Sequence, residues 1–234
     1  MTKEDRIRYA RTIAIPEIGR EGQRQLLSAK VLVVGCGALG NIAATYLTAA
    51  GVGEIAIADF DTVDISNLQR QIMFSTSDAG QPKCESLARR LRELNPTVRI
   101  IEIPRMVRTN EAADLFPEFD FIIDGSDNPP TKFMTSREAF RSSTPCSIGG
   151  VSELSGQATT FVPGSTPYHE IFSETSVAGA LPCSIGGVLG PVPGIVGSIQ
   201  AAEAIKYITQ TGELLTNRLL NFNLARMEFN IFRF

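Results

Sequence analysis

The chain has 234 residues, of which 43% are hydrophobic and 20% charged, and its formal net charge is −3. This length and composition are those of an ordinary globular protein with one sizeable hydrophobic core. The slightly acidic balance argues against nucleic acid as a partner, because nucleic acid calls for a basic surface. No apolar stretch approaches the ~20 residues that span a bilayer, and the charged N-terminus leads into no apolar run. We therefore expect a cytoplasmic protein with no membrane partner.

Short apolar runs alternate with helical segments over the first 150 residues, after a helical arm at residues 1–28. Strands are expected at residues 30–34, 54–58, 98–103, 119–124 and 146–148, and helices at residues 41–50, 82–94, 111–115 and 131–142. This alternation predicts βαβ units and an α/β fold with a Rossmann-like, doubly wound, mostly parallel sheet. Ligands of such sheets bind where the parallel strands end.

The pattern changes after residue 151. It predicts an alternating strand at 157–162, a loop at 163–182, a long helix at 195–209 and two closing antiparallel strands within 218–234. No linker is recognisable, so we expect a single domain over residues 1–234, in which residues 29–150 form the nucleotide-binding portion. The apolar strands at 219–222 and 229–232 can pack in the core or grip a partner, and core packing is favoured.

A glycine-rich turn joins the first expected strand to the first long helix. Gly35, Gly37 and Gly40 fit G-x-G-x-x-G, where glycines allow a tight turn and the helix N-terminus presents free N–H groups to phosphate. Asp59 ends the next strand, where a carboxylate can accept hydrogen bonds from ribose hydroxyls. By itself the turn indicates a nucleotide and would favour NAD or FAD, while a tight turn without a ligand stays possible.

Further polar residues favour a nucleoside triphosphate. Arg70 and Lys83 can neutralise β- and γ-phosphates, whereas hydride transfer needs neither. Asn67 can donate to a phosphate oxygen, and Asp127 follows the fourth strand, where its carboxylate can hold Mg²⁺. Taken singly, each charge could be a solvated surface residue.

The four cysteines form no C-x-x-C pair, so we expect no zinc site. Cys36, Cys84 and Cys146 are interpreted as small buried residues. The single histidine, His169, is expected at the surface rather than as a general base.

Together these residues carry a resemblance, over nearly the whole chain, to the ThiF/MoeB/HesA family of adenylyltransferases, relatives of the ubiquitin-activating enzymes. The segments that resemble the family are residues 8–11, 35–40, 59–61, 66–71, 80–83, 126–128, 187–191 and 200–206. Many members also carry two C-x-x-C pairs that bind zinc; this chain has other residues at 167–170, where the first pair would fall.

The resemblance implies a homodimer that binds ATP and Mg²⁺ and a ubiquitin-like sulfur carrier ending in Gly-Gly. The carrier carboxylate would attack the α-phosphate, and residues 151–234 would bind the carrier and form the dimer. The implied nucleotide contacts are Gly35, Gly37, Ala38, Asp59, Asp61, Asn67, Arg70, Gln71, Lys83, Asp127 and Asn128. The implied catalytic residues are Arg11, supplied by the neighbouring subunit, together with Arg70, Lys83, Cys183 and Asp127, which would bind Mg²⁺.

Cys183 resembles the cysteine that bonds to the carrier in ThiF-type members, and its Gly- and Ser-rich surroundings suit a reacting thiol. Loop packing is the alternative interpretation. The chain shows no rhodanese-like extension, so a separate protein is expected to donate sulfur.

The favoured carrier is ThiS-like and serves thiamin thiazole synthesis, with a MoaD-like molybdopterin carrier or another sulfur carrier as the alternative. An NAD-dependent oxidoreductase and a non-catalytic dimer partner are two further classes. Arg70 and Lys83 argue against both.

Overall fold

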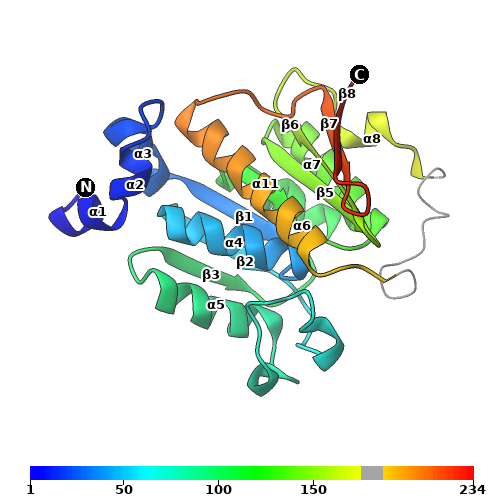
Figure 1. The fold of residues 1–234 in the computed structure, drawn as a ribbon, viewed down its shortest axis with the longest axis horizontal. Coiled ribbons are helices and arrows are strands. Elements are labelled where there is room, and N and C mark those ends of the chain that lie inside the picture. Colours follow the sequence, from blue (N-terminus) through cyan, green and yellow to red (C-terminus); the bar gives the residue numbers. More distant parts are fainter. Residues whose placement is uncertain (175–186) are drawn as a thin grey trace.

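One mixed sheet runs through the molecule, with helices on both faces (Figure 1). This computed structural model describes residues 1–174 and 187–234. Within them the sheet has the strand order β3-β2-β1-β4-β5-β6-β7-β8. The strands are β1 (Lys30–Val34), β2 (Glu54–Ala58), β3 (Arg99–Ile103), β4 (Phe121–Asp124), β5 (Cys146–Ser152), β6 (Ser155–Phe161), β7 (Arg218–Asn223) and β8 (Glu228–Arg233).

The first five strands are parallel and the last three add antiparallel pairs, which confirms the fold class expected from the sequence. The described helices are α1 (Lys3–Arg8), α2 (Ala10–Ile13), α3 (Gly19–Ser28), α4 (Ala38–Ala50), α5 (Lys83–Leu94), α6 (Thr109–Leu115), α7 (Pro129–Ser142), α8 (Tyr168–Ile171) and α11 (Pro191–Thr209). None of them is long and apolar enough to cross a membrane.

The central strand β1 is buried on both faces, which explains its continuous apolar sequence. Val31 and Val33 point into a core shared with α3, α4, α5 and α11. Leu32 and Val34 point into a second core shared with α6 and α7. Because successive side chains of a strand alternate between faces, one short run of apolar residues holds both helical layers in place.

Four helices begin earlier than the sequence pattern predicts, among them α6 at Thr109 and α11 at Pro191. Helix α4 begins at Ala38, directly after the glycine turn, and α7 begins at Pro129. Proline is tolerated in the first helical turn because its missing N–H has no intrahelical partner there. The Asn128 side chain caps α7 by accepting a hydrogen bond from the Thr131 N–H at 3.0 Å.

The loop expected at 163–182 contains the short helix α8, so that part of the prediction is wrong. The ring of Tyr168 is buried and lies 5.5 Å from the ring of Phe133 on α7 and 4.7 Å from that of Phe172. His169 is half-buried rather than at the surface, and its Nδ1 shares a 2.8 Å hydrogen bond with the Ser136 hydroxyl. Aromatic packing on α7 therefore orders a segment whose composition is typical of a loop.

The C-terminal strands pair as expected, but β8 does not pack in the core. Every residue of β8 is exposed, including Phe229, Ile231 and Phe232. On β7, in contrast, Phe222 is buried, and its ring stacks on that of Phe229 at 5.2 Å. Strand β8 is the last strand of the sheet, and the exposure of its apolar side chains corrects the interpretation of 229–232 as core.

Three cysteines lie in the interior, as expected. Cys36, Cys84 and Cys146 are buried and free. Burial raises the pKa of the Cys146 thiol, and the pKa of Cys36 is raised by its contact with the Cys84 sulfur, 3.8 Å away, and by burial. The thiols of Cys36 and Cys146 are therefore protonated at neutral pH. All three cysteines pack as small, largely apolar groups.

Candidate functional site

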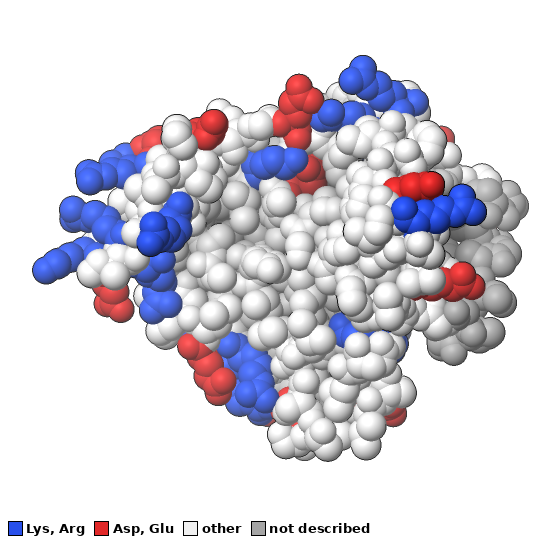
Figure 2. All heavy atoms as spheres, viewed as in Figure 1, with Lys and Arg blue, Asp and Glu red and all other residues white. Residues whose placement is uncertain are grey.

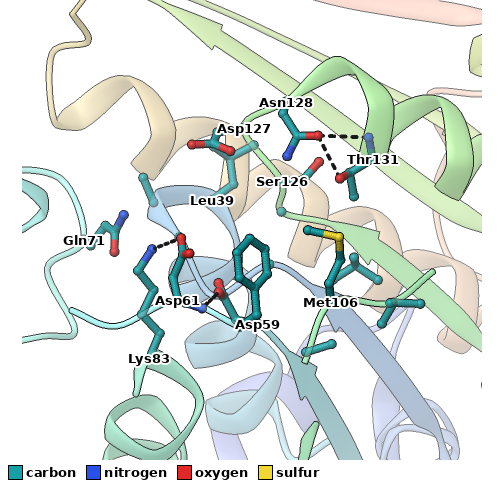
Figure 3. Close-up of a pocket in the computed structure, with 18 of the residues that line it drawn as sticks. Leu39, Asp59, Asp61, Gln71, Lys83, Met106, Ser126, Asp127, Asn128 and Thr131 are labelled. Atoms are coloured by element: carbon teal, nitrogen blue, oxygen red, sulfur yellow. Dashed lines mark hydrogen bonds and ion pairs between the residues drawn. The ribbon is translucent and has the colours of Figure 1, made fainter. Parts of the chain in front are cut away.

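A pocket opens at the edge of the sheet where the parallel strands end (Figure 3). Its walls come from the segments that follow β1, β2, β3 and β4, namely residues 35–39, 59–61, 105–107 and 125–128. Arg70, Gln71 and Lys83 close one side, and Thr131, Val151 and Val188 complete the lining. The structure thus places a pocket at the edge that the βαβ pattern predicts for a ligand.

The glycine turn is tightly packed on one side and open on the other. Gly35 has φ +95°, and a Cβ on Gly40 would come within 1.8 Å of the Gly35 carbonyl oxygen. A Cβ on Gly37, in contrast, would meet no atom closer than the Gln71 Nε2 at 3.8 Å. The turn therefore excludes side chains where the backbone crosses itself and leaves space on the side of the pocket.

This turn leads directly into the N-terminus of α4. Gly37 occupies the N-cap position and offers no side chain to the first N–H groups of the helix. Such uncapped N–H groups, at the positive end of the helix dipole, are suited to bind phosphate.

Asp59 links the end of β2 to the glycine turn. Its Oδ2 accepts a hydrogen bond from the Cys36 N–H at 2.7 Å, and its Oδ1 accepts one from the Asp61 N–H at 2.8 Å. Burial raises the pKa of the Asp59 carboxyl, although these N–H groups and the Lys83 charge partly offset the effect. Two backbone contacts hold the carboxylate still, and each oxygen keeps a lone pair that can accept from a ribose hydroxyl.

The cationic side of the pocket consists of Lys83 and Arg70. Lys83 opens α5, is only 7% exposed, and donates from Nζ to the Asp61 Oδ2 at 2.9 Å (Figure 3). Arg70 donates from Nη1 to the Ser66 carbonyl oxygen at 3.1 Å. Gln71 lines the same pocket, and its buried amide oxygen has no hydrogen-bond partner among the described residues. An unpaired buried acceptor in a pocket wall fits a site that is completed by a ligand.

The loop between β4 and α7 brings acidic and amide groups to the opposite side. Asp127 is exposed, and none of the residues that the structure describes forms a hydrogen bond or ion pair with its carboxylate. The Oδ1 of Asn128 is engaged by the Thr131 N–H and hydroxyl, so only its amide N–H groups remain for a ligand. An exposed carboxylate in the wall of such a pocket is the kind of group that binds Mg²⁺.

All of the implied nucleotide contacts except Asn67 line this pocket. Asn67 lies in the short 3₁₀ helix Ile65–Asn67, and its N–H donates to the Asp64 carbonyl oxygen at 2.9 Å. Arg11 is an exposed residue of α2 and lines no part of the pocket in its own chain. Cys183 lies outside the described residues.

The sequence reasoning missed several lining residues. Phe60 and Met106 expose apolar side chains to the pocket, and Arg105, Val107, Ser126 and Thr131 also line it. Residues 105–107 follow the expected third strand. The rule that every parallel strand ends at the ligand edge would have pointed to them.

The fold and this pocket define a nucleotide-binding α/β protein of the Rossmann-like type. Residues 9–234 match the ThiF family, and the chain belongs to it. It is an adenylyltransferase, the class to which its named relatives belong.

Three relatives illustrate the match. The chain is 42% identical to the SAMP-activating enzyme E1 of Haloferax volcanii, over 95% of this chain and 83% of the relative. It is 36% identical to the sulfur carrier protein adenylyltransferase of Thermus thermophilus, over 97% of this chain and 87% of the relative. It is 37% identical to the probable adenylyltransferase/sulfurtransferase MoeZ of Mycobacterium tuberculosis, over 98% of this chain but only 60% of the longer relative.

Solved structures show the same fold. E. coli MccB, crystallised with ATP, superposes with a TM-score of 0.79 and 25% identity, over 91% of this chain and 65% of MccB. PaaA superposes with a TM-score of 0.84 over all of this chain and 74% of PaaA, at 20% identity. The PaaA match concerns the fold alone.

Proposed function

We propose that this protein uses ATP to adenylate the C-terminal Gly-Gly carboxylate of a ubiquitin-like sulfur carrier. The observation that carries the proposal is the placement of Lys83 and Arg70 in the same pocket as the glycine turn and the Asp127 carboxylate. An NAD-dependent hydride transfer has no use for these cations, whereas a triphosphate needs them. The names of the Haloferax and Thermus relatives support an activating enzyme for a small protein.

In this proposal each wall of the pocket holds one part of ATP. Asp59 accepts from the ribose hydroxyls, and Phe60 and Met106 offer apolar surface to the base. The uncapped N-terminus of α4 faces the phosphates. Lys83 has three N–H donors and uses one on Asp61, so two remain for phosphate oxygens without breaking that pair.

The chemistry needs no side-chain nucleophile. A C-terminal carboxylate is ionised at neutral pH and can itself attack the α-phosphate, releasing pyrophosphate. Arg70 and Lys83 offset the charge that builds on the phosphates. Asp127 is the group that would hold Mg²⁺, which supplies further charge neutralisation when bound.

A homodimer is part of the proposal, with Arg11 contributing to the neighbouring subunit's pocket. The face that carries α4 and α11 shows few charged side chains, whereas Lys and Arg gather at the end formed by the N-terminal helices (Figure 2). A shallow apolar depression on α4 and α11 is lined by Ile42, Tyr46, Ile72, Pro191, Ile195 and Ile199. Such a surface supports association with a second copy.

Residues 151–234 are the proposed carrier-binding portion. The exposed apolar residues of β8 lie on the same sheet as β5, and Val151 of β5 lines the pocket. A carrier seated on the last strands could therefore extend its C-terminal tail toward the pocket. We keep a ThiS-like carrier as the first candidate and a MoaD-like carrier as the second, with a separate sulfur donor, and the cytoplasm as the compartment.

Carrier-dependent exchange of labelled pyrophosphate into ATP tests the function. With ATP, Mg²⁺ and one candidate carrier at a time, we expect exchange with at least one carrier. Arg70→Ala and Lys83→Ala should each reduce it by about 100-fold or more, since each removes charge stabilisation from the phosphates. Arg92→Ala, on α5 outside the pocket, serves as the control. Tight NAD binding without exchange for any carrier would refute the proposal.

A further inference from the structure

The loop that carries Asp127 is held by a buried ion pair beneath the pocket. Lys132, in the first turn of α7, is 8% exposed, and Asp124, the last residue of β4, is fully buried. The Lys132 Nζ donates to the Asp124 Oδ1 at 2.9 Å and to the Ser126 carbonyl oxygen at 2.6 Å. One ammonium group therefore ties the strand end, the loop and the following helix together.

Further hydrogen bonds fix both sides of Asp127. The Asp124 Oδ1 also accepts from the Ser126 hydroxyl at 2.8 Å, and the Asp124 carbonyl oxygen accepts from the Gln200 amide of α11 at 2.8 Å. On the other side, Asn128 is held by its cap on Thr131 (Figure 3). Asp127 thus lies between two anchored neighbours, and at Ser126 it is the carbonyl oxygen that Lys132 holds.

We propose that Lys132 is a positioning residue of the nucleotide site: its hydrogen bond to the Ser126 carbonyl oxygen sets the place of the Asp127 carboxylate and so the affinity for Mg²⁺-nucleotide. The inference rests on the proposed role of Asp127. Its physical basis is that groups outside the ligand shell orient the ligands, and their loss typically weakens metal binding 10- to 100-fold. A plain buried ion pair, in contrast, would affect stability without affecting Mg²⁺.

The test compares nucleotide binding with and without metal. Calorimetry measures the Kd of α,β-methylene-ATP in Mg²⁺ and in EDTA, and the ratio of the two values reports the contribution of Mg²⁺. Because Lys132→Met alone strands the buried Asp124 charge, the main variant is Asp124→Asn/Lys132→Met, which removes both charges together. Lys206→Met/Glu203→Gln is the matched control, since Lys206 pairs with the buried Glu203 on α11 away from the pocket.

In the double variant, we expect the ratio of the Kd in EDTA to the Kd in Mg²⁺ to fall about tenfold. The Kd in EDTA should stay within about twofold of the wild-type value. Lys132→Arg, which keeps the charge and the donors, should restore most of the ratio. A double variant with the wild-type ratio, or a control with an equal loss, would overturn the inference. Asp127→Ala separates the two proposals: if it abolishes the ratio while the double variant does not, only the role of Lys132 fails. If Asp127→Ala leaves the ratio unchanged, the Mg²⁺ site and the inference fail together.

Discussion

The Asp78 carboxylate connects the turn before α5 to that helix. Its Oδ2 accepts from the Ser75 N–H and from the Ser75 hydroxyl, each at 2.8 Å, and it pairs with Arg89 and Arg90 of α5. Burial acts to raise the pKa of Asp78, but these hydrogen bonds and positive charges outweigh it and lower the pKa below its usual value. Because Lys83 is the first residue of α5, Asp78 supports one wall of the pocket from outside it.

Asp78→Asn should lower the free energy of unfolding at pH 7 by about 1.5–3 kcal/mol, since it weakens charged hydrogen bonds to a buried group. A carboxyl with a depressed folded pKa contributes stability above its unfolded pKa, near 4, and loses it as the pH falls through the folded value. Urea unfolding should therefore show the stability gap between wild type and variant narrowing as the pH is lowered from 7 to below 4. Asp114→Asn, at an exposed site, is the control. An equal gap at both pH values would contradict this account.

At the scale of elements, the glycine turn and α4 act as one unit. The turn depends on close backbone contact at Gly35, Gly40 and Gly125; a Cβ on Gly125 would lie 2.7 Å from the Gly35 carbonyl oxygen. Gly37 is different, because its missing Cβ faces the pocket and its φ of −72° suits any residue. We therefore infer that two glycines of one motif serve different purposes, Gly40 for folding and Gly37 for nucleotide binding.

The pair Gly40→Ala and Gly37→Ala tests this division. Gly40→Ala should cost about 3 kcal/mol or more from overpacking, despite the better helix propensity of alanine. The free energy of unfolding of Gly37→Ala should lie within about 0.5 kcal/mol of the wild-type value, as it does for surface substitutions. This variant should nevertheless bind ATP more weakly, because its methyl group occupies the space of a phosphate. Thermal unfolding and nucleotide titration measure both. Equal stability losses in the two variants would show that Gly37 is also required for packing.

At the scale of the whole molecule, the site of one chain is incomplete in the proposed mechanism. Arg11 lies on α2, away from its own pocket, while Lys83 lies within it. If Arg11 acts in the neighbouring subunit, Arg11→Ala and Lys83→Ala are each inactive alone but complement each other. A mixed dimer then holds one intact site, assembled from Lys83 of one chain and Arg11 of the other.

Mixing equal amounts of the two variants under exchange of subunits should restore about a quarter of wild-type pyrophosphate exchange, because half the dimers are mixed and each has one intact site. Cross-linked homodimers of each variant, mixed without subunit exchange, are the control and should stay inactive. Recovery in that control, or none in the mixed dimers, would argue against an arginine supplied in trans.

The exposed edge strand β8 is a second feature at the scale of the whole molecule. Ile231 and Phe232 on β8 are each 55% exposed. Polar replacements there should therefore change the free energy of unfolding by no more than about 0.5 kcal/mol. We expect Phe232→Glu to weaken carrier binding by about tenfold or more, while the Kd for ATP is unchanged. Glu228→Gln, on the same strand, is the control. Unaltered carrier affinity would place the carrier on another surface.

The sequence by itself determined the parallel sheet, its closing antiparallel strands and the pocket residues of the glycine turn and strand ends. The family resemblance added Ala38, Asp61, Gln71 and Asn128. The physical reason is that these features are local: apolar runs form strands, glycines form the turn, and parallel strands end at one edge. What lay beyond local pattern was decided by the tertiary structure. Aromatic packing formed α8 in an expected loop, and the edge position of β8 exposed residues that resemble core.

The same distinction holds within the site. Position along the sequence marked Asp127 and Lys83 as candidates, and their carboxylate and ammonium groups suit Mg²⁺ and phosphate. Only the structure paired Lys83 with Asp61 and placed Lys132 beneath the Asp127 loop. It also brought Met106 to the pocket, and separated Asn67 and Arg11 from it. These contacts join segments that are distant in the sequence. They depend on side-chain geometry, which cannot be derived from the spacing of residues along the chain.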